Sequence, residues 1–192
     1  MHNFFAYMAR MKFINRWSLM NSNDNENIAE HSMQTAQIAH SIAVIKNLLF
    51  QGNVNVDRVA TLALYHEAAE VITGDLPTPI KYFNPQIRTA FKDIETLASE
   101  KLLTMLPKEL QDYYRDLVIQ DEDSYEHILV KAADKISAYV KCMEEMRFGN
   151  KEFAKAEKSL KKEVEAYYIY PEVKYFCDSF LSSFTKTLDE LD

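Results

Sequence analysis

Apolar residues recur three and four positions apart along almost the whole chain, and this spacing constrains the fold more than any other feature. An α-helix turns by about 100° per residue, so such spacing gathers apolar side chains on one face. The 192 residues include only three glycines, too few for a turn-rich β protein, and no stretch of strict apolar and polar alternation enriched in β-branched residues stands out. We therefore predict an all-α fold. The chain has no internal repeat or long linker, so residues 1–192 are predicted to form a single domain.

Local signals predict where the helices begin and end. Residues typical of helix N-caps stand at Asn27, Asn55, Asn84 and Ser124, and Glu30 would complete a capping box with Asn27. Glycine, proline or a polar loop ends each pattern. The predicted helices are about His2 to Ile14, Asn27 to Leu49, Asn55 to Gly74, Pro85 to Pro107, Lys108 to Val118, Ser124 to Gly149, Glu152 to Tyr167 and Glu172 to Leu188.

The composition excludes several classes of partner. A net charge of -7 and a pI near 5.3 argue against a nucleic-acid polymer or an anionic membrane surface as the main partner. No apolar run approaches the roughly 20 residues that span a bilayer, and the N-terminus lacks the pattern of a signal peptide. We expect a cytoplasmic protein whose two cysteines, Cys142 and Cys177, are reduced and packed as small apolar side chains.

The stretch Tyr65 to Pro79, YHEAAEVITGDLPTP, concentrates residues that carry chemistry. His66 and Glu67 are adjacent, Glu70 follows His66 by one helical turn, and Asp75 lies in the proline-bounded loop after Gly74. Imidazole and carboxylate groups at a helix end are typical ligands of a divalent metal ion. This stretch is therefore the predicted active centre.

Two residues on other helices are candidates to complete the centre. His31 and Asp134 each lie among small and apolar residues, which suggests that both point inward. Alone, an inward histidine is more often a hydrogen-bonded core residue than a ligand, and a salt bridge from Asp134 to Lys131 or Lys135 is the simpler interpretation of that acid. The sequence alone does not decide whether His31 and Asp134 are metal ligands or structural residues. His40 falls about 180° around the helix from His31, so both cannot face one metal.

Arg16 and Trp17 are adjacent at the end of the first predicted helix. They would be a surface arginine beside a core tryptophan, or a pair in which guanidinium grips a phosphate while the ring covers a sugar or base. The spacing favours neither interpretation.

The ordered motifs of the chain resemble those of a known family. EHS (Glu30 to Ser32), YHEAAE, GDLPTP (Gly74 to Pro79) and KAAD (Lys131 to Asp134) resemble the HD-domain superfamily of metal phosphohydrolases. With INRW, KYFN and YVKCMEE, at residues 14–17, 81–84 and 139–145, the chain looks like a bacterial 5′-deoxynucleotidase of the YfbR type. The likeness covers nearly the whole chain.

The resemblance implies an all-helical HD-domain bundle, a homodimer and hydrolysis of deoxyribonucleoside 5′-monophosphates. It also implies metal ligands that fall on His31, His66, Glu67 and Asp134. We expect them to hold one divalent ion, and two imidazoles with two carboxylates suit Co²⁺, Mn²⁺, Zn²⁺ or Fe²⁺. Glu70 and Asp75 match the family's other site acids, and Arg16 and Trp17 match its substrate-gripping pair. We expect Glu70 to orient water or move its proton, and Asp75 to accept a hydrogen bond from the 3′-hydroxyl.

One residue departs from the family pattern, because Glu67 stands where the HD pair has aspartate. Its extra methylene moves the carboxylate by about one bond length, whereas ligand distances tolerate roughly 0.2 Å. Two alternatives therefore stay open. The chain could be a non-catalytic HD nucleotide-binding protein with a weakened metal site, or an HD phosphodiesterase or pyrophosphohydrolase acting on another nucleotide.

Overall fold

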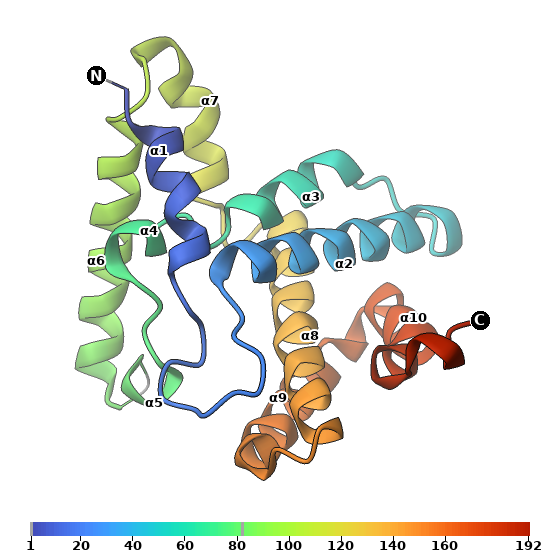
Figure 1. The fold of residues 1–192 in the computed structure, drawn as a ribbon. Coiled ribbons are helices and arrows are strands. Elements are labelled where there is room, and N and C mark those ends of the chain that lie inside the picture. Colours follow the sequence, from blue (N-terminus) through green and yellow to red (C-terminus); the bar gives the residue numbers. More distant parts are fainter. Residues whose placement is uncertain (1, 82) are drawn as a thin grey trace.

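The computed structural model describes residues 2–81 and 83–192, and these form α-helices joined by short 3₁₀ helices and loops (Figure 1). Within the described residues the one extended pairing is an isolated antiparallel bridge between Asn15 and Asn27. The predicted all-α fold is confirmed. The elements are α1 (Phe4–Met8), η1 (Ala9–Phe13), α2 (Ile28–Leu49), α3 (Val56–Tyr65), α4 (Glu70–Thr73), α5 (Thr78–Lys81), α6 (Pro85–Leu103), α7 (Lys108–Val118), α8 (Tyr125–Arg147), η2 (Lys151–Phe153), α9 (Ala154–Ala166), η3 (Tyr167–Ile169), α10 (Pro171–Phe180), η4 (Leu181–Thr185) and η5 (Leu188–Glu190).

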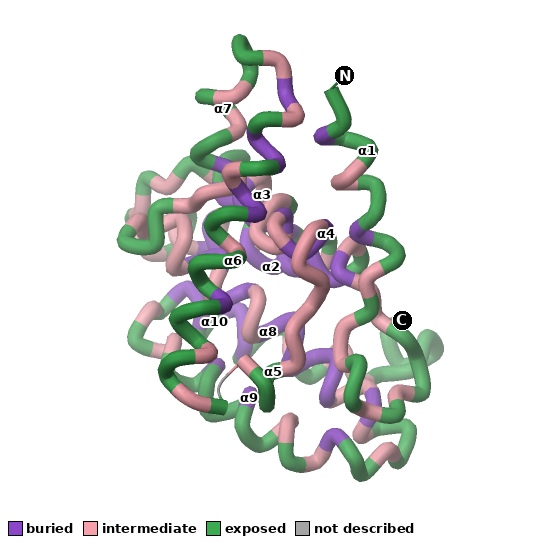
Figure 2. Tube along the Cα trace, turned by 90° about the vertical axis from the view of Figure 1, so that its left-hand side faces the viewer, coloured by how far each residue is buried: buried purple, intermediate pink, exposed green. Residues whose placement is uncertain are grey.

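Helices α2 and α8 form the centre of the bundle. They pack against each other and against α3, while α9 packs on α8 and α10 on α2. Helices α1, α6 and α7 lie together on one side of this centre, and α9 and α10 lie on the other (Figure 1). Buried residues concentrate on α2 and α8 (Figure 2), so side chains that project from these two helices meet inside the protein.

The predicted N-caps are confirmed. The side chain of Asn27 accepts from the backbone N–H groups of Ala29 and Glu30, and Glu30 completes the capping box of α2. Asn55, Asn84 and Ser124 cap α3, α6 and α8 in the same way. These bonds satisfy N–H groups that have no partner within the helix.

The predicted unbroken helix from Asn55 to Gly74 is wrong. Helix α3 ends at Tyr65, and turns separate it from α4. His66 Nδ1 lies 2.6 Å from the carbonyl oxygen of Ala63, the group that a continuing α-helix would bond to the N–H of Glu67. Bonds of the tighter i to i+3 type follow, from Ala68 to Tyr65 and from Glu70 to Glu67.

The last predicted helix is too long, since α10 ends at Phe180 instead of Leu188. Ser183 Oγ bonds the carbonyl of Phe180 at 2.8 Å and Thr185 Oγ1 bonds that of Ser182 at 3.2 Å. Such side-chain bonds compete with a regular helix, and 3₁₀ turns follow. The KYFN motif includes Tyr82, which lies outside the described residues.

Two groups of buried apolar residues hold the bundle together. The larger lies among α2, α3, α8, α9 and α10, and the smaller lies among α1, the start of α2, α4 and α6. Tyr65 and Tyr114 pack against both groups. Cys142 and Cys177 are free and buried in the larger group, as predicted. Among the helices that the structure describes, none is both long and apolar enough to cross a membrane.

Candidate metal centre

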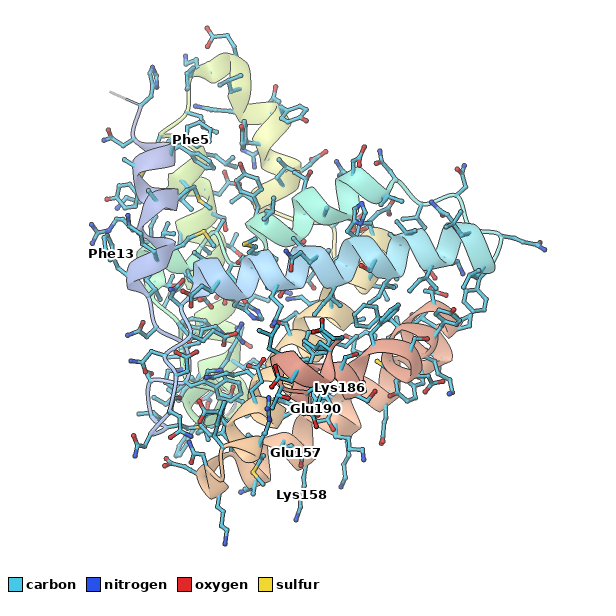
Figure 3. The ribbon with its side chains drawn as sticks, turned by 45° about the vertical axis from the view of Figure 1, so that its right-hand side comes forward. Phe5, Phe13, Glu157, Lys158, Lys186 and Glu190 are labelled. Atoms are coloured by element: carbon cyan, nitrogen blue, oxygen red, sulfur yellow. The ribbon has the colours of Figure 1, made fainter. Side chains whose placement is uncertain are left out.

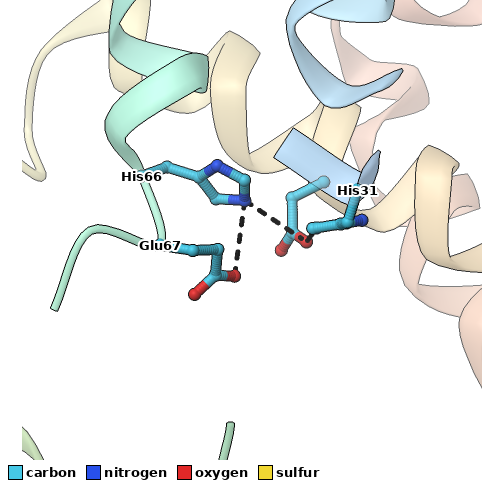
Figure 4. A group of neighbouring side chains, drawn as sticks. His31, His66 and Glu67 are labelled. Carbon is cyan, nitrogen blue, oxygen red and sulfur yellow. Dashed lines mark hydrogen bonds and ion pairs between the residues drawn. The ribbon is translucent and has the colours of Figure 1, made fainter. Parts of the chain in front are cut away.

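After the break that follows α3, the side chains of His66 and Glu67 lie close to that of His31 (Figure 4). Because His66 Nδ1 donates to Ala63, its Nε2 atom carries the lone pair. This Nε2 is buried and has no hydrogen-bond partner among the described residues, although it lies 3.3 Å from Glu67 Oε1. A buried lone pair facing a carboxylate indicates that a cation belongs between them.

His31 lies in the first turn of α2, fully buried, and faces the same space. Ser137 Oγ donates to Gln34 Oε1 at 2.6 Å and therefore accepts from His31 Nδ1 at 3.1 Å. The Nε2 atom of His31 is then unprotonated, 3.0 Å from Asp134 Oδ1. A hydrogen-bonded Nδ1 and a free Nε2 are typical of a histidine that binds a metal.

Asp134 projects from the middle of α8 toward both histidines. Its Oδ1 lies 3.0 Å from His31 Nε2 and 3.9 Å from His66 Nε2. Lys135 instead pairs with Glu163 at 3.0 Å. Burial opposes the charge of Asp134, but the two histidines outweigh it and hold the pKa of Asp134 well below its ordinary value.

These side chains meet although three separate segments supply them. One ligand atom each from His31, His66, Glu67 and Asp134 lies within 4.8 Å of the others, and Figure 4 shows the first three turned toward one another. Burial and the charge of Arg16 lower the pKa of His31, so its ring is neutral and able to bind a cation. Two imidazoles and two carboxylates form a donor set that suits a divalent transition metal.

Glu70 is buried one turn beyond Glu67. Burial, followed by the charge of Glu67 and a hydrogen bond to it, raises the pKa of Glu70 to about 11. Burial also opposes the charge of Glu67, but its interaction with the adjacent His66 draws its pKa down to about 2. The two acids thus share one proton, which Glu70 holds. Asp75 is less buried than Glu70, and desolvation raises its pKa.

Arg16 faces the acids of the centre. Burial disfavours its charge, but Glu26, Asp134, Glu67 and Asp75 together outweigh this effect and raise its pKa. Its Nη1 atom is buried without a hydrogen-bond partner within the described part of the chain. Trp17 packs on Phe153 with ring centroids 5.3 Å apart and is only partly buried. Arg16 is therefore not the surface residue of the first interpretation, whereas Trp17 keeps an exposed portion.

Two further acids, Glu26 and Glu145, contact the segment that carries Arg16 and Trp17 or the loop beside it, and the sequence alone did not indicate them. Glu26 Oε2 accepts from Trp17 Nε1 at 3.0 Å and lies 3.5 Å from Arg16 Nε. Glu145 on α8 accepts from the backbone N–H groups of Asn23 and Asp24, and thereby holds the loop that carries Glu26. The YVKCMEE motif contains Glu145, but Glu145 is far in sequence from Asn23 and Asp24, so no local pattern indicates that it contacts them.

The remaining histidines stay outside the centre. His40 is exposed on α2, consistent with its position opposite His31. His127 is half-buried, and its Nδ1 lies 3.1 Å from Gln120 Oε1.

Comparison with solved structures shows which fold the chain has. An HD-domain phosphohydrolase from Listeria innocua matches with a TM-score of 0.84 and 23% identity, covering 95% of this chain and 88% of its own. A cyanophage S-2L HD phosphohydrolase matches with a TM-score of 0.66 and 17% identity, covering 93% and 96%. The chain therefore has the HD-domain phosphohydrolase fold, as predicted.

Sequence comparisons give the family. The profile described as 5′-deoxynucleotidase YfbR-like matches residues 3–184. A 5′-deoxynucleotidase from Vibrio vulnificus is 51% identical over 98% of this chain and 97% of its own length. One from Yersinia pestis is 52% identical over 100% and 97%. The chain belongs to the YfbR-like 5′-deoxynucleotidase family, and it is an enzyme of the phosphoric monoester hydrolase class.

Proposed function

We propose that this chain removes the 5′-phosphate from deoxyribonucleoside 5′-monophosphates at one divalent ion held by His31, His66, Glu67 and Asp134. The observation that carries the proposal is the pair of Nε2 lone pairs facing carboxylates inside the bundle. When bound, such an ion neutralises phosphate charge and lowers the pKa of a coordinated water. The substrate class follows the names of the Vibrio and Yersinia relatives.

Arg16 would bind the phosphate, because its guanidinium lies near the acids of the centre and its buried Nη1 has no hydrogen-bond partner among the described residues. A guanidinium can bind two phosphate oxygens at once. Trp17 would lie over the sugar and exclude a 2′-hydroxyl by its bulk, and Asp75 would accept a hydrogen bond from the 3′-hydroxyl.

Glu70 would manage the proton. The raised pKa of this carboxyl leaves it protonated near neutral pH, within hydrogen-bond reach of Glu67. As water adds to phosphorus and the bond to the 5′-oxygen breaks, one proton must leave the water and one must reach the nucleoside oxygen. A buried acid with a displaced pKa is suited to this transfer.

The identity of the metal is a separate proposal. Zn²⁺, Mn²⁺, Co²⁺ and Fe²⁺ all accept two imidazoles and two carboxylates. The cyanophage S-2L phosphohydrolase was solved with dA and one catalytic Zn²⁺ ion, which supports a single ion and a deoxynucleoside product here. Titration of metal-free protein with each ion, followed by mass spectrometry, would give the stoichiometry.

A substrate panel tests the function. Phosphate release from deoxyribonucleoside 5′-monophosphates should exceed release from the ribonucleotides. Equal rates would remove the sugar selectivity, and a faster phosphodiester or pyrophosphate substrate would favour the rival HD activities. Absence of release with every metal, together with weak metal binding, would favour a non-catalytic nucleotide-binding protein.

We also propose a homodimer in the cytoplasm, built from chains that each form one HD domain. Sharing of Tyr65 and Tyr114 between the two apolar groups supports one domain. Met33 and Leu64 are exposed beside Ala36 and Ala60 in a groove between α2 and α3, which is a candidate dimer surface. Phe13 also points outward (Figure 3), but Arg10 and Lys12 lie over its ring.

The aromatic C-terminal segment is a poorer dimer surface. Phe176 is buried, and Tyr167, Tyr168, Tyr170 and Phe184 pack against the larger apolar group. Sedimentation equilibrium of the native protein and of Met33→Lys tests the groove. A dimer that becomes monomeric in the variant would support it, and a native monomer would contradict the homodimer.

A further inference from the structure

We propose that Glu26 is a positioning residue that holds Arg16 and Trp17 in the orientation needed to bind the nucleotide. The inference rests on the substrate roles proposed for these two residues. Glu26 lies in the loop between η1 and α2, and its side chain is only 11% exposed. One carboxylate oxygen, Oε2, contacts both residues: it accepts from Trp17 Nε1 at 3.0 Å and lies 3.5 Å from Arg16 Nε.

The backbone reinforces the same pairing. The N–H of Arg16 donates to the carbonyl of Glu26 at 2.9 Å, and the N–H of Ile28 donates to the carbonyl of Ile14 at 3.0 Å. Between these bonds, Asn15 and Asn27 form the antiparallel bridge. The segment that carries Arg16 is thus fastened to the start of α2, directly before the metal-facing His31.

Trp17 needs an external constraint because its backbone is unusual. Its φ is +59°, in the left-handed region that side chains with a Cβ rarely adopt. Such a conformation persists only where neighbouring contacts enforce it. The contacts here are the Glu26 bond to the indole N–H, the Phe153 ring at 5.3 Å and the bond from the N–H of Met20 to the carbonyl of Trp17.

The position of Glu26 also determines which nitrogen atoms of the Arg16 guanidinium are available to a ligand. The carboxylate engages the Nε side, while Nη1 stays buried and unpartnered among the described residues. A guanidinium fixed at Nε is pre-oriented, so less freedom is lost when it binds phosphate. This arrangement leaves donors of Arg16 available to a ligand that contains several anionic oxygens.

Helix α8 holds the loop in place. Glu145 accepts from the N–H groups of Asn23 and Asp24 at 3.0 and 3.3 Å, and Lys141 Nζ donates to the carbonyl of Asp24 at 2.5 Å. Glu145 and Lys141 are both buried and lie 2.7 Å apart. Glu26 is therefore positioned by α8, the helix that also supplies Asp134.

Two substitutions separate positioning from simple electrostatics. Glu26→Gln keeps an oxygen for the indole N–H but removes the charge beside Arg16, whereas Glu26→Ala removes both. Loss of a negative charge alone would favour phosphate binding and lower KM. Loss of positioning should instead raise KM for a deoxyribonucleoside 5′-monophosphate, by about tenfold in Glu26→Gln, and lower kcat/KM by about 100-fold in Glu26→Ala.

The indole N–H resonance gives a readout independent of metal and turnover. Trp17 is the only tryptophan, so the ¹H–¹⁵N spectrum of metal-free protein contains one indole signal. This signal should stay near its native position in Glu26→Gln and move in Glu26→Ala. Glu152→Gln is the matched control, because Glu152 accepts from the N–H of Asn21 in the same loop but forms no hydrogen bond or ion pair with Arg16 or Trp17 within the described part of the chain.

The kinetic and spectroscopic results together test whether Glu26 positions Arg16 and Trp17. A lower KM in Glu26→Gln, or native KM and an unmoved indole signal in Glu26→Ala, would overturn it. The isosteric glutamine variant keeps the test decisive if the alanine variant does not fold. Arg16→Ala is measured in parallel: native KM in that variant would refute the phosphate role of Arg16, while the indole signal would still report whether Glu26 holds Trp17.

Discussion

Glu67 Oε1 lies 3.3 Å from His66 Nε2, although the two residues are neighbours in sequence and Glu67 replaces the shorter aspartate of the HD motif. The end of α3 at Tyr65 explains how this is possible. His66 and Glu67 leave the helix through tight turns, so their side chains converge instead of pointing about 100° apart. The backbone therefore accommodates the longer carboxylate.

We predict that Glu67→Asp lowers activity. Aspartate would withdraw the carboxylate by about 1.5 Å from the position that this turn provides, which exceeds the tolerance of a metal bond. Metal affinity and kcat/KM should each fall about tenfold or more. Glu67→Gln, of equal length but without charge, is the control. If the Glu67→Asp variant were more active than the native protein, glutamate would be impairing the metal site, contrary to this prediction.

Arg16→Lys should impair substrate binding while leaving metal content unchanged. Lysine keeps the charge but cannot bind two phosphate oxygens in a planar fork, so we expect KM to rise about tenfold. Steady-state kinetics measures the change, and Arg10→Lys, in the neighbouring η1, serves as control. An unchanged KM would exclude the clamp.

Glu70→Gln should lower kcat by about 100-fold, because the amide cannot transfer a proton. Glutamine retains hydrogen-bonding groups of similar shape, so the metal should still bind. Kinetics and metal analysis on one preparation separate these effects. Loss of the metal together with activity would make Glu70 a structural partner of Glu67 instead.

Glu145 should make stability depend on acid pH. Burial opposes its charge, but the bonds from Lys141, Asn23 and Asn150 outweigh burial and lower its pKa from 4.5 to about 2. A lowered pKa stabilises the folded state above pH 4.5, and this contribution is lost as the pH falls toward 2. Glu145→Gln should therefore cost about 2 kcal/mol at neutral pH.

Urea unfolding at several pH values measures this effect. The difference in unfolding free energy between native and Glu145→Gln protein should be constant above pH 4.5 and shrink below it. A difference that does not change with pH would assign the cost to packing.

The sequence predicted those features of the fold that depend on residues close together in the chain. The caps at Asn27, Asn55, Asn84 and Ser124 act within one turn, and the structure has all four. The helical interruption at His66 was not predicted, because it depends on a side chain that takes over the Ala63 carbonyl. Periodicity cannot register such competition.

The sequence indicated some residues of the site but not others, again because it does not show contacts that form only in the folded protein. The residues that the family motifs mark are brought together around His31 and Asp134. Glu26 escaped notice because its contacts form only when its polar loop folds back on Arg16. Tertiary pairing of that kind has no periodicity or spacing from which it could be inferred.

The most direct test is phosphate release from a deoxyribonucleoside 5′-monophosphate before and after the metal is removed. Chelator-treated protein should be inactive, and Zn²⁺, Mn²⁺, Co²⁺ or Fe²⁺ should restore release in native protein but not in His31→Ala or Asp134→Ala. Full activity in verified metal-free protein, or restoration in both variants, would contradict the four-ligand metal centre.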